Sequence, residues 1–202
     1  MNLGVIKSKI KSGKEYLKFK SKKLSFNLCD FWKWSVSDLL SNATRGRLAE
    51  FIVATVTNID LNIPREEWAA YDLITPDNIK IEVKSAAYIQ SWHQDHLSNI
   101  LFSIKPSLYW DSKTNKQSKI KGRYVDVYVM CLLFNKNQKD IDPLDLNQWK
   151  FYVLSVDEIN NYKRSQLSIT LKSLESLTKA VSYDQLCSEI KNKYKAIFKL
   201  YV

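Results

Sequence analysis

An alternating stretch at residues 79–85, with the sequence IKIEVKS, constrains the fold of this chain more than any other feature. Its β-branched residues occupy every second position and its charged residues lie between them, a pattern typical of a strand with one buried face. Residues 75–78 contain a proline and an asparagine, which favour a tight turn, and residues 71–74 precede them. The sequence therefore predicts a β-hairpin, residues 71–74 with 79–85, that places Glu82 and Lys84 side by side on one face.

Acidic and basic groups converge on this predicted hairpin. Asp72 lies on the first strand, from which it would share a face with Glu82 and Lys84. Carboxylate oxygens suit magnesium, which takes few protein ligands and uses water and substrate phosphate for the rest. A metal held by Asp72 and Glu82 would polarise a phosphodiester, and Lys84 would orient the attacking water or stabilise charge on the phosphate. The alternative is a surface hairpin whose Glu–Lys pair has no catalytic role.

A helix predicted at residues 44–57 brings a third carboxylate toward this hairpin. The helix is apolar nearly all round, so we expect it to be buried. Glu50 lies on its small, apolar stripe, where a carboxylate is costly unless it is paired or bound to a metal. Either Glu50 contributes to the metal site, or it forms an i, i+3 pair with Arg47.

Charge and length narrow the class of protein. With 202 residues the chain is expected to form one domain, residues 1–202, which on this interpretation is a nuclease domain with a basic N-terminal arm at residues 1–23. A net charge of +10 favours a nucleic-acid partner; an anionic membrane surface or an uninformative basic surface are the alternatives. The three cysteines show no metal-ligand spacing and there is no signal sequence or membrane-spanning run, so we expect a cytoplasmic protein without membrane association.

Two lysine-rich segments are candidates for contacting nucleic acid. The N-terminal arm would follow a DNA backbone, or would simply be a solvated terminus. The polar segment 111–123 would be a DNA-contacting loop or a mobile surface loop. Its basic residues are Lys113, Lys116, Lys119, Lys121 and Arg123.

The remaining elements complete an α/β fold. Strands are predicted at 97–104, at 124–134 as a central strand covered on both faces, and at 150–154. Capping boxes predict helices after Ser155 and after Ser182. The aromatic-rich segment 24–34 is interpreted as core, followed by a short helix capped by Ser35 or Ser37 and reaching Leu40. Together these elements predict a central mixed β-sheet of about five strands flanked by helices.

The combination of Asp72, Glu82 and Lys84 on a hairpin, with Glu50 on the preceding helix, resembles the PD-(D/E)XK nuclease superfamily over roughly residues 45–155. This resemblance implies a restriction-endonuclease-like fold and a Mg²⁺ cofactor, with Mn²⁺ as a substitute. It also implies a metal site that includes Asp72, Glu82, Glu50 and Val83. The departure is a tyrosine in place of the proline that precedes the aspartate, at a position that varies widely in the superfamily. Among related nucleases a glutamine after the lysine sometimes contacts water or phosphate, which makes Gln90 a candidate catalytic residue.

The function predicted from these features is metal-dependent hydrolysis of DNA phosphodiester bonds by an endonuclease. A homodimer would suit symmetric cleavage of a duplex. One alternative is a nucleic-acid-binding module with no activity. Others are a Holliday-junction resolvase, a transposon end-cleaving subunit or an RNA nuclease on the same fold, or a basic interaction protein with no nucleic-acid role. The sequence leaves these alternatives open.

Overall fold

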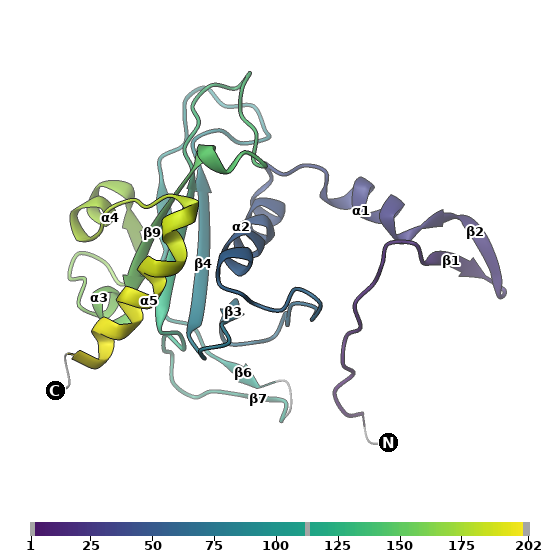
Figure 1. Cartoon of the computed structure of the whole chain (residues 1–202), viewed down its shortest axis with the longest axis horizontal. Helices are drawn as coiled ribbons and strands as arrows, with labels where there is room; N and C mark the ends of the chain where they lie inside the picture. Colours follow the sequence, from purple (N-terminus) through teal and green to yellow (C-terminus); the bar gives the residue numbers. More distant parts are fainter. Residues whose placement is uncertain (1–2, 112–113, 200–202) are drawn as a thin grey trace.

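A mixed four-stranded sheet forms the centre of the molecule in a computed structural model that describes residues 3–111 and 114–199 (Figure 1). Its strands, in spatial order, are β3 (Leu73–Ile74), β4 (Lys80–Ala87), β8 (Val127–Leu133) and β9 (Trp149–Ser155). The central pair, β4 and β8, is parallel, and the two outer pairs are antiparallel. The α/β class and the mixed sheet predicted from the sequence are thus confirmed.

Strand β8 is the most deeply buried element of this sheet. All seven of its residues are buried, and it pairs along its whole length with β4 on one side and β9 on the other. Side chains from β8 enter two separate hydrophobic cores, one on each face of the sheet. This confirms the prediction that the apolar run at 124–134 forms a central strand covered on both faces.

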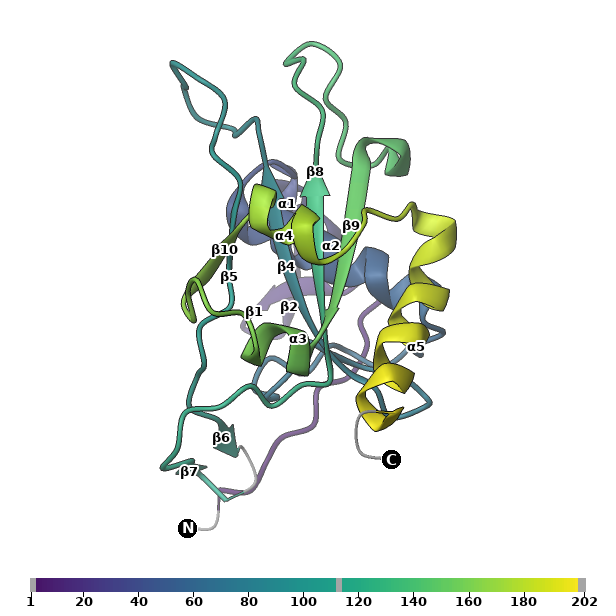
Figure 2. The same cartoon turned by 90° about the vertical axis from the view of Figure 1, so that its left-hand side faces the viewer.

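Helices and short strands cover the two faces. Helices α2 (Asn42–Val56) and α5 (Tyr183–Lys199) contribute to the core on one face. The opposite core, on the side that faces the viewer in Figure 2, is closed by α3, α4 and a two-stranded sheet of β5 and β10. The bounds of these four elements are Val156–Asn160, Leu171–Leu177, Leu101–Ser103 and Ser168–Thr170.

Strand β4 divides its side chains between these two faces. Ile81 and Val83 lie in the core beneath α2 and α5. Glu82 and Lys84 point to the opposite face and stay half-buried. The predicted alternation is confirmed, and it is this alternation that places the charged pair beside the edge of the second core.

Two predictions about strands were wrong in detail. The segment 97–104 forms a strand only at Leu101–Ser103, and this strand pairs with β10 outside the central sheet, which therefore has four strands and not about five. A period-2 pattern reports a buried face but not the partner strand, so the sequence did not reveal this. The predicted loop 111–123 contains a small hairpin of β6 (Trp110–Asp111) and β7 (Lys116–Gln117).

The first part of the chain projects from the rest as an arm, defined here as residues 3–36 (Figure 1). It contains a hairpin of β1 (Tyr16–Phe19) and β2 (Lys22–Asn27), followed by α1 (Leu28–Val36). Helix α1 begins after Asn27, which forms a capping box with Asp30, so the helix predicted to start at Ser35 or Ser37 was placed too late.

The prediction that the aromatic residues of segment 24–34 form part of the core was wrong. Phe26 is 60% exposed and Trp34 is 84% exposed. The reason is geometric: the hairpin and α1 extend away from the sheet, so no second layer covers their aromatic side chains.

The predicted starts of two later helices are confirmed. Ser155 and Glu158 form the capping box of α3, and the Ser182 amide donates to the Gln185 side chain at the start of α5. Within the described residues, none of the helices combines the length and apolar character needed to cross a bilayer.

Candidate active site

The hairpin of β3 and β4 holds Asp72 against the strand that carries Glu82. The turn closes as predicted: the Thr75 amide donates to the Ile79 carbonyl at 3.0 Å, and Asn78 adopts a φ of 61°. The Asp72 amide donates to the Ile81 carbonyl at 3.1 Å, and the Asp72 Oδ2 accepts from the Val83 amide at 2.8 Å. Backbone bonds on both sides of Glu82 therefore fix the position of the Asp72 carboxylate.

Glu82 and Lys84 form an ion pair on the half-buried face of β4. Burial raises the pKa of the Glu82 carboxyl, the Lys84 ammonium opposes this rise, and the nearby Asp72 carboxylate adds to it. An additional positive charge nearby would therefore stabilise the ionised form of Glu82.

Glu50, on α2, joins this group through Arg65. Arg65 forms ion pairs with Glu50 and Glu67, and its Nη2 lies 3.9 Å from Asp72 Oδ1. Burial raises the pKa of Glu50; the hydrogen bond from Arg65 opposes this rise, and the charge of Asp72 adds to it. Of the two sequence-based alternatives, the i, i+3 pair with Arg47 was wrong about the partner, because Glu50 pairs with Arg65.

Two adjoining clefts meet at Glu82. One, of about 250 Å³, is lined by Asp72, Glu82 and the aromatic rings of Trp68, Tyr109, Trp110 and Tyr124. The other, of about 480 Å³, is lined by Glu82, Lys84, Lys121 and Tyr128 among others.

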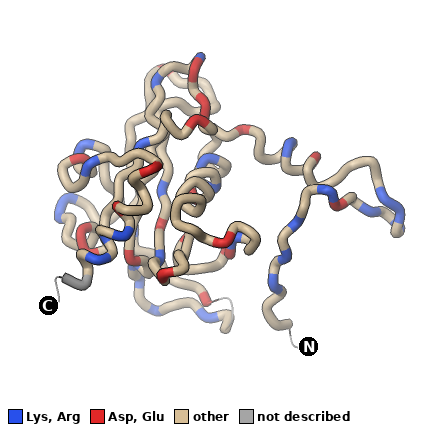
Figure 3. The backbone as a smooth tube through the Cα atoms, in the orientation of Figure 1, with Lys and Arg blue, Asp and Glu red and all other residues tan. Residues whose placement is uncertain are grey.

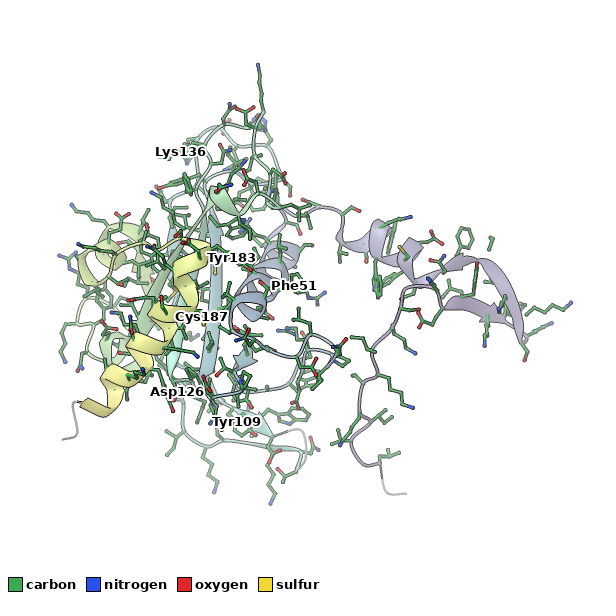
Figure 4. The ribbon with its side chains drawn as sticks, in the orientation of Figure 1. Phe51, Tyr109, Asp126, Lys136, Tyr183 and Cys187 are labelled. Atoms are coloured by element: carbon green, nitrogen blue, oxygen red, sulfur yellow. The ribbon has the colours of Figure 1, made fainter. Side chains whose placement is uncertain are left out.

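The aromatic rings of the first cleft come from segments far apart in the sequence. Trp68 packs edge-on against Trp110, with ring centroids 5.3 Å apart, and Tyr109 packs against Tyr124 at 5.7 Å. Figure 4 shows Tyr109 and Asp126 at the same end of the sheet, where Asp126 Oδ2 accepts from the Lys80 amide at the start of β4. An aromatic wall thus stands next to the Asp72 and Glu82 carboxylates.

Tyr128 is a cleft residue that sequence reasoning missed. It lies on β8 directly beside Glu82 in the parallel register of the sheet. Burial and the adjacent Glu82 charge raise the pKa of the Tyr128 phenol to about 12, so it stays protonated at neutral pH and can donate a hydrogen bond. The sequence signalled only a buried strand; the register that brings Tyr128 beside Glu82 is a tertiary property.

Other predicted site residues have different surroundings. Gln90 is buried, accepts from the Arg45 guanidinium at 3.0 Å and donates to the Ala87 carbonyl and to Ser98, which gives it a structural role at the end of β4. The Arg123 guanidinium binds the Ile104 carbonyl, Asn160 and Gln166.

Lysines of the predicted DNA-contacting segment divide into two groups. Lys121 lines the same cleft as Glu82 and Lys84. Lys116 and Lys119 are exposed on the β6–β7 hairpin and just after it. Lys113 lies outside the described residues.

The donor chemistry of this site suits a hard cation. Asp72 and Glu82 line one cleft with oxygen ligands, and magnesium needs few of these from the protein. Residues 3–111 and 114–199 contain no group of three or more His, Cys, Asp or Glu side chains placed to hold a metal ion. Arg65 and Lys84 are the present ionic partners of these carboxylates, and the Val83 amide is bonded to Asp72.

Comparison with known families shows the family of the chain. A family model for bacteriophage T4 endonuclease IV matches residues 6–173, which is most of the chain. The chain belongs to the bacteriophage T4 endonuclease IV family. A search of curated proteins found no match.

The T4 endonuclease IV match includes both the arm and the candidate active site. It begins at residue 6, before β1, and runs through α2, the β3–β4 hairpin and β9. It ends within α4, before the C-terminal helix α5. The nuclease class predicted from Asp72, Glu82 and Lys84 agrees with membership of this endonuclease family.

Proposed function

We propose that this protein is a metal-dependent DNA endonuclease of restriction-endonuclease-like architecture, with the Asp72, Glu82 and Lys84 group of the PD-(D/E)XK superfamily as its active site. The observation that carries the proposal is the backbone bond that locks Asp72 beside the Glu82–Lys84 pair, in a chain of the T4 endonuclease IV family. The order of helix α2, hairpin and charged strand β4 supports it.

Asp72 and Glu82 would hold Mg²⁺, or Mn²⁺ in its place, and Glu50 would support them from α2. A bound cation of this kind supplies Lewis-acid polarisation of the phosphodiester. Its positive charge would offset the burial and the mutual repulsion that raise the pKa values of Glu50 and Glu82.

Cationic and donor groups around Glu82 would act on the substrate directly. Lys84 places its ammonium in the cleft, where it would orient the attacking water or neutralise charge on the phosphate. Lys121, in the same cleft, adds a second positive charge, and the protonated Tyr128 phenol adds a hydrogen-bond donor. These groups favour an anionic phosphodiester over a neutral substrate.

The aromatic wall favours a nucleic acid over a simple phosphate ester. Trp68, Tyr109 and Tyr124 border the cleft that contains Asp72 and Glu82. Rings in this position offer an apolar surface to the sugar and base next to the scissile phosphate.

One observation favours a second candidate, a nucleic-acid-binding module without activity. Arg65 and Lys84 already pair with the carboxylates that would bind a metal. If these pairs persist in the presence of divalent cations, the cleft would bind phosphate without hydrolysing it.

A plasmid-nicking assay separates these two functions. The wild type would be run with Mg²⁺, with Mn²⁺ and with EDTA, beside Lys84→Ala and Asp72→Asn. Lys150→Ala is the matched control, because Lys150 is an exposed lysine on β9. We expect metal-dependent nicking that either site substitution lowers by about 10²-fold or more, the cost typical of removing one group that stabilises transition-state charge.

Equal nicking by wild type and Lys84→Ala would overturn the assigned site. Intact plasmid under every condition, together with salt-sensitive DNA binding, would assign the chain to the non-catalytic alternative. Circular dichroism of each variant would establish that lost activity does not come from lost folding.

A further inference from the structure

The arm carries most of the net charge of the chain. Residues 3–36 contain nine lysines against the two acidic residues Glu15 and Asp30, so seven of the ten net positive charges lie there. Figure 3 shows lysines recurring along the whole length of the arm. The rest of the chain is nearly balanced, so the arm is a distinct positive region.

Local bonds give the arm a defined shape. The Leu28 amide donates to the Glu15 carbonyl and the Cys29 amide to the Gly13 carbonyl, each at 2.9 Å, which ties α1 back to the segment before β1. Gly13 has a φ of 87°, and a Cβ there would lie 2.9 Å from the Trp32 ring, so only glycine fits. Residues 12–36 of the arm therefore have a defined structure, whereas residues 3–11 are exposed and form no helix or strand.

Both acidic groups of the arm are used to build this shape. The Glu15 carboxylate accepts from the amides of Ser12 and Gly13, and the Asp30 carboxylate accepts from the Asn27 amide in the capping box. The lysines of the hairpin, in contrast, are exposed. The arm thus holds its negative charges in internal bonds and presents its positive charges to solvent.

Repulsion between two lysines destabilises the hairpin, and a bound anion would remove this repulsion. Lys18 lies directly opposite Lys23 in the β1–β2 register. Like charges at directly opposed positions destabilise a strand pair, and a two-stranded hairpin is marginal even without this repulsion. A polyanion bound across the hairpin would neutralise both ammonium groups.

Aromatic rings are interleaved with these lysines. Phe19, at the tip, is 64% exposed, and Phe26 and Tyr16 are also exposed. The Lys20 ammonium lies 5.5 Å from the centroid of the Phe19 ring, and the Lys23 ammonium 5.4 Å from that of Tyr16. Lysines for phosphate and exposed rings for sugar and base are the combination found in nucleic-acid-binding surfaces.

We infer that the arm is a second nucleic-acid-binding surface. It binds a part of the DNA other than the phosphodiester bound at Asp72 and Glu82. This inference rests on the proposed function for the identity of the substrate. The arm is joined to the body by residues 37–41, where Asp38 Oδ1 accepts from the amides of Leu40 and Ser41, and Ile10 of the arm lines a cleft with Glu50 and Arg65 of the body. Helix α2, which carries Glu50, follows directly, so a strand held by the arm has a high effective concentration at the cleft.

The nearly balanced charge of the body argues against a second copy of the chain as the occupant of this surface. An interface with another copy would bring the positive arm onto a surface without matching net negative charge. DNA supplies a regular row of phosphates that matches lysines spaced along a hairpin.

A charge-matched pair of variants of the full chain tests this inference. The arm variant replaces Lys18, Lys20, Lys22 and Lys23 with Gln. The control variant makes the same replacement at four exposed lysines of the body, Lys139, Lys163, Lys172 and Lys179. Binding would be measured in EDTA with fluorescently labelled DNA of about 40 nucleotides, and with DNA of about eight nucleotides, which is too short to cover both surfaces at 3.4 Å per nucleotide.

We expect the arm variant to bind the long DNA about tenfold or more weakly. The slope of log affinity against log salt concentration should become less negative by about 3, as the loss of four phosphate contacts predicts. The control variant should change both quantities much less. The ratio of long-DNA to short-DNA affinity should fall in the arm variant and stay near the wild-type value in the control variant, because only the long DNA can cover the arm and the cleft together. In cleavage assays, KM for long DNA should rise in the arm variant while kcat stays within about twofold, because binding and not the chemical step is affected.

The aromatic contribution is tested separately. Replacing Phe19 and Phe26 with Ala should weaken binding of the long DNA severalfold without changing the salt dependence, because no phosphate contact is lost.

Equal losses in the arm and control variants would overturn the inference. So would an arm variant with unchanged DNA affinity that no longer binds phosphatidylserine vesicles or no longer dimerises in sedimentation. Failure of the proposed function is distinguishable, because binding in EDTA requires no cleavage. Arm-dependent DNA binding without any nicking would contradict the proposed endonuclease activity and support the inference about the arm.

Discussion

Aromatic residues in the sheet and in the arm have opposite surroundings. Phe151 and Tyr152 on β9 are almost fully buried, whereas Phe26 and Trp34 of the arm are largely exposed. Both regions consist of strands and helices with interspersed apolar residues. What differs is the second layer: each face of the sheet is covered, and the hairpin of the arm is not.

This difference shows two ways of specifying structure within one chain. The body is stabilised by burial of apolar area between layers. The arm is specified by backbone bonds, one glycine with positive φ and a capping box, and none of the residues of β1, β2 or α1 is buried. A region of the second kind is suited to gain its remaining stability from a partner.

The largest expected effect comes from matched truncations in the two regions. Phe151→Ala should lower the free energy of unfolding by about 3–5 kcal/mol, because it leaves a cavity in a closed core. Phe19→Ala should change it by no more than about 0.5 kcal/mol, because its ring is exposed. Urea unfolding of both variants measures this; a comparable loss for Phe19→Ala would show that the arm is packed in solution.

A smaller effect is expected from the two capping boxes, one in each region. Asn27→Ala in the arm and Ser155→Ala in the body each remove a cap worth about 1 kcal/mol. The first should speed hydrogen exchange only at amides of the arm, since α1 has no buried residue and packs against β2. The second should lower global stability, as judged by urea unfolding. Faster exchange in the body of the Asn27 variant would contradict the separation of the two regions.

The smallest expected effect concerns pH and two glutamates. Burial raises the pKa of Glu82 above its usual value, so the folded protein binds more protons and this group lowers stability as pH rises through that window. Hydrogen bonds from backbone amides lower the pKa of Glu15, so its contribution is present above its usual pKa and is lost as pH falls.

Thermal melts in EDTA between about pH 4 and pH 7, a range that spans the usual carboxyl pKa, distinguish the two glutamates. Glu82→Gln should raise the melting temperature slightly at pH 7, and Glu15→Gln should leave it unchanged or lower it. A lower melting temperature for Glu82→Gln at pH 7 would show that its ion pair with Lys84 outweighs its burial.

Several features followed from the sequence because they depend on neighbouring residues. The alternation of residues 79–85 predicted which side chains of β4 enter the core, and the proline and asparagine before it predicted the turn. The apolar run at 124–134 predicted the central strand. The capping boxes at Ser155 and Ser182 predicted the starts of α3 and α5, because a cap requires only residues three positions apart.

Only the tertiary structure decided how these elements meet. It placed Arg65 between Glu50 and Asp72, set Tyr128 beside Glu82, and paired β5 with β10 outside the central sheet. It also left the aromatic residues of the arm exposed, where their composition had favoured a core. Pairing between strands distant in the chain, and the coverage of one layer by another, depend on contacts that a local pattern does not specify by itself.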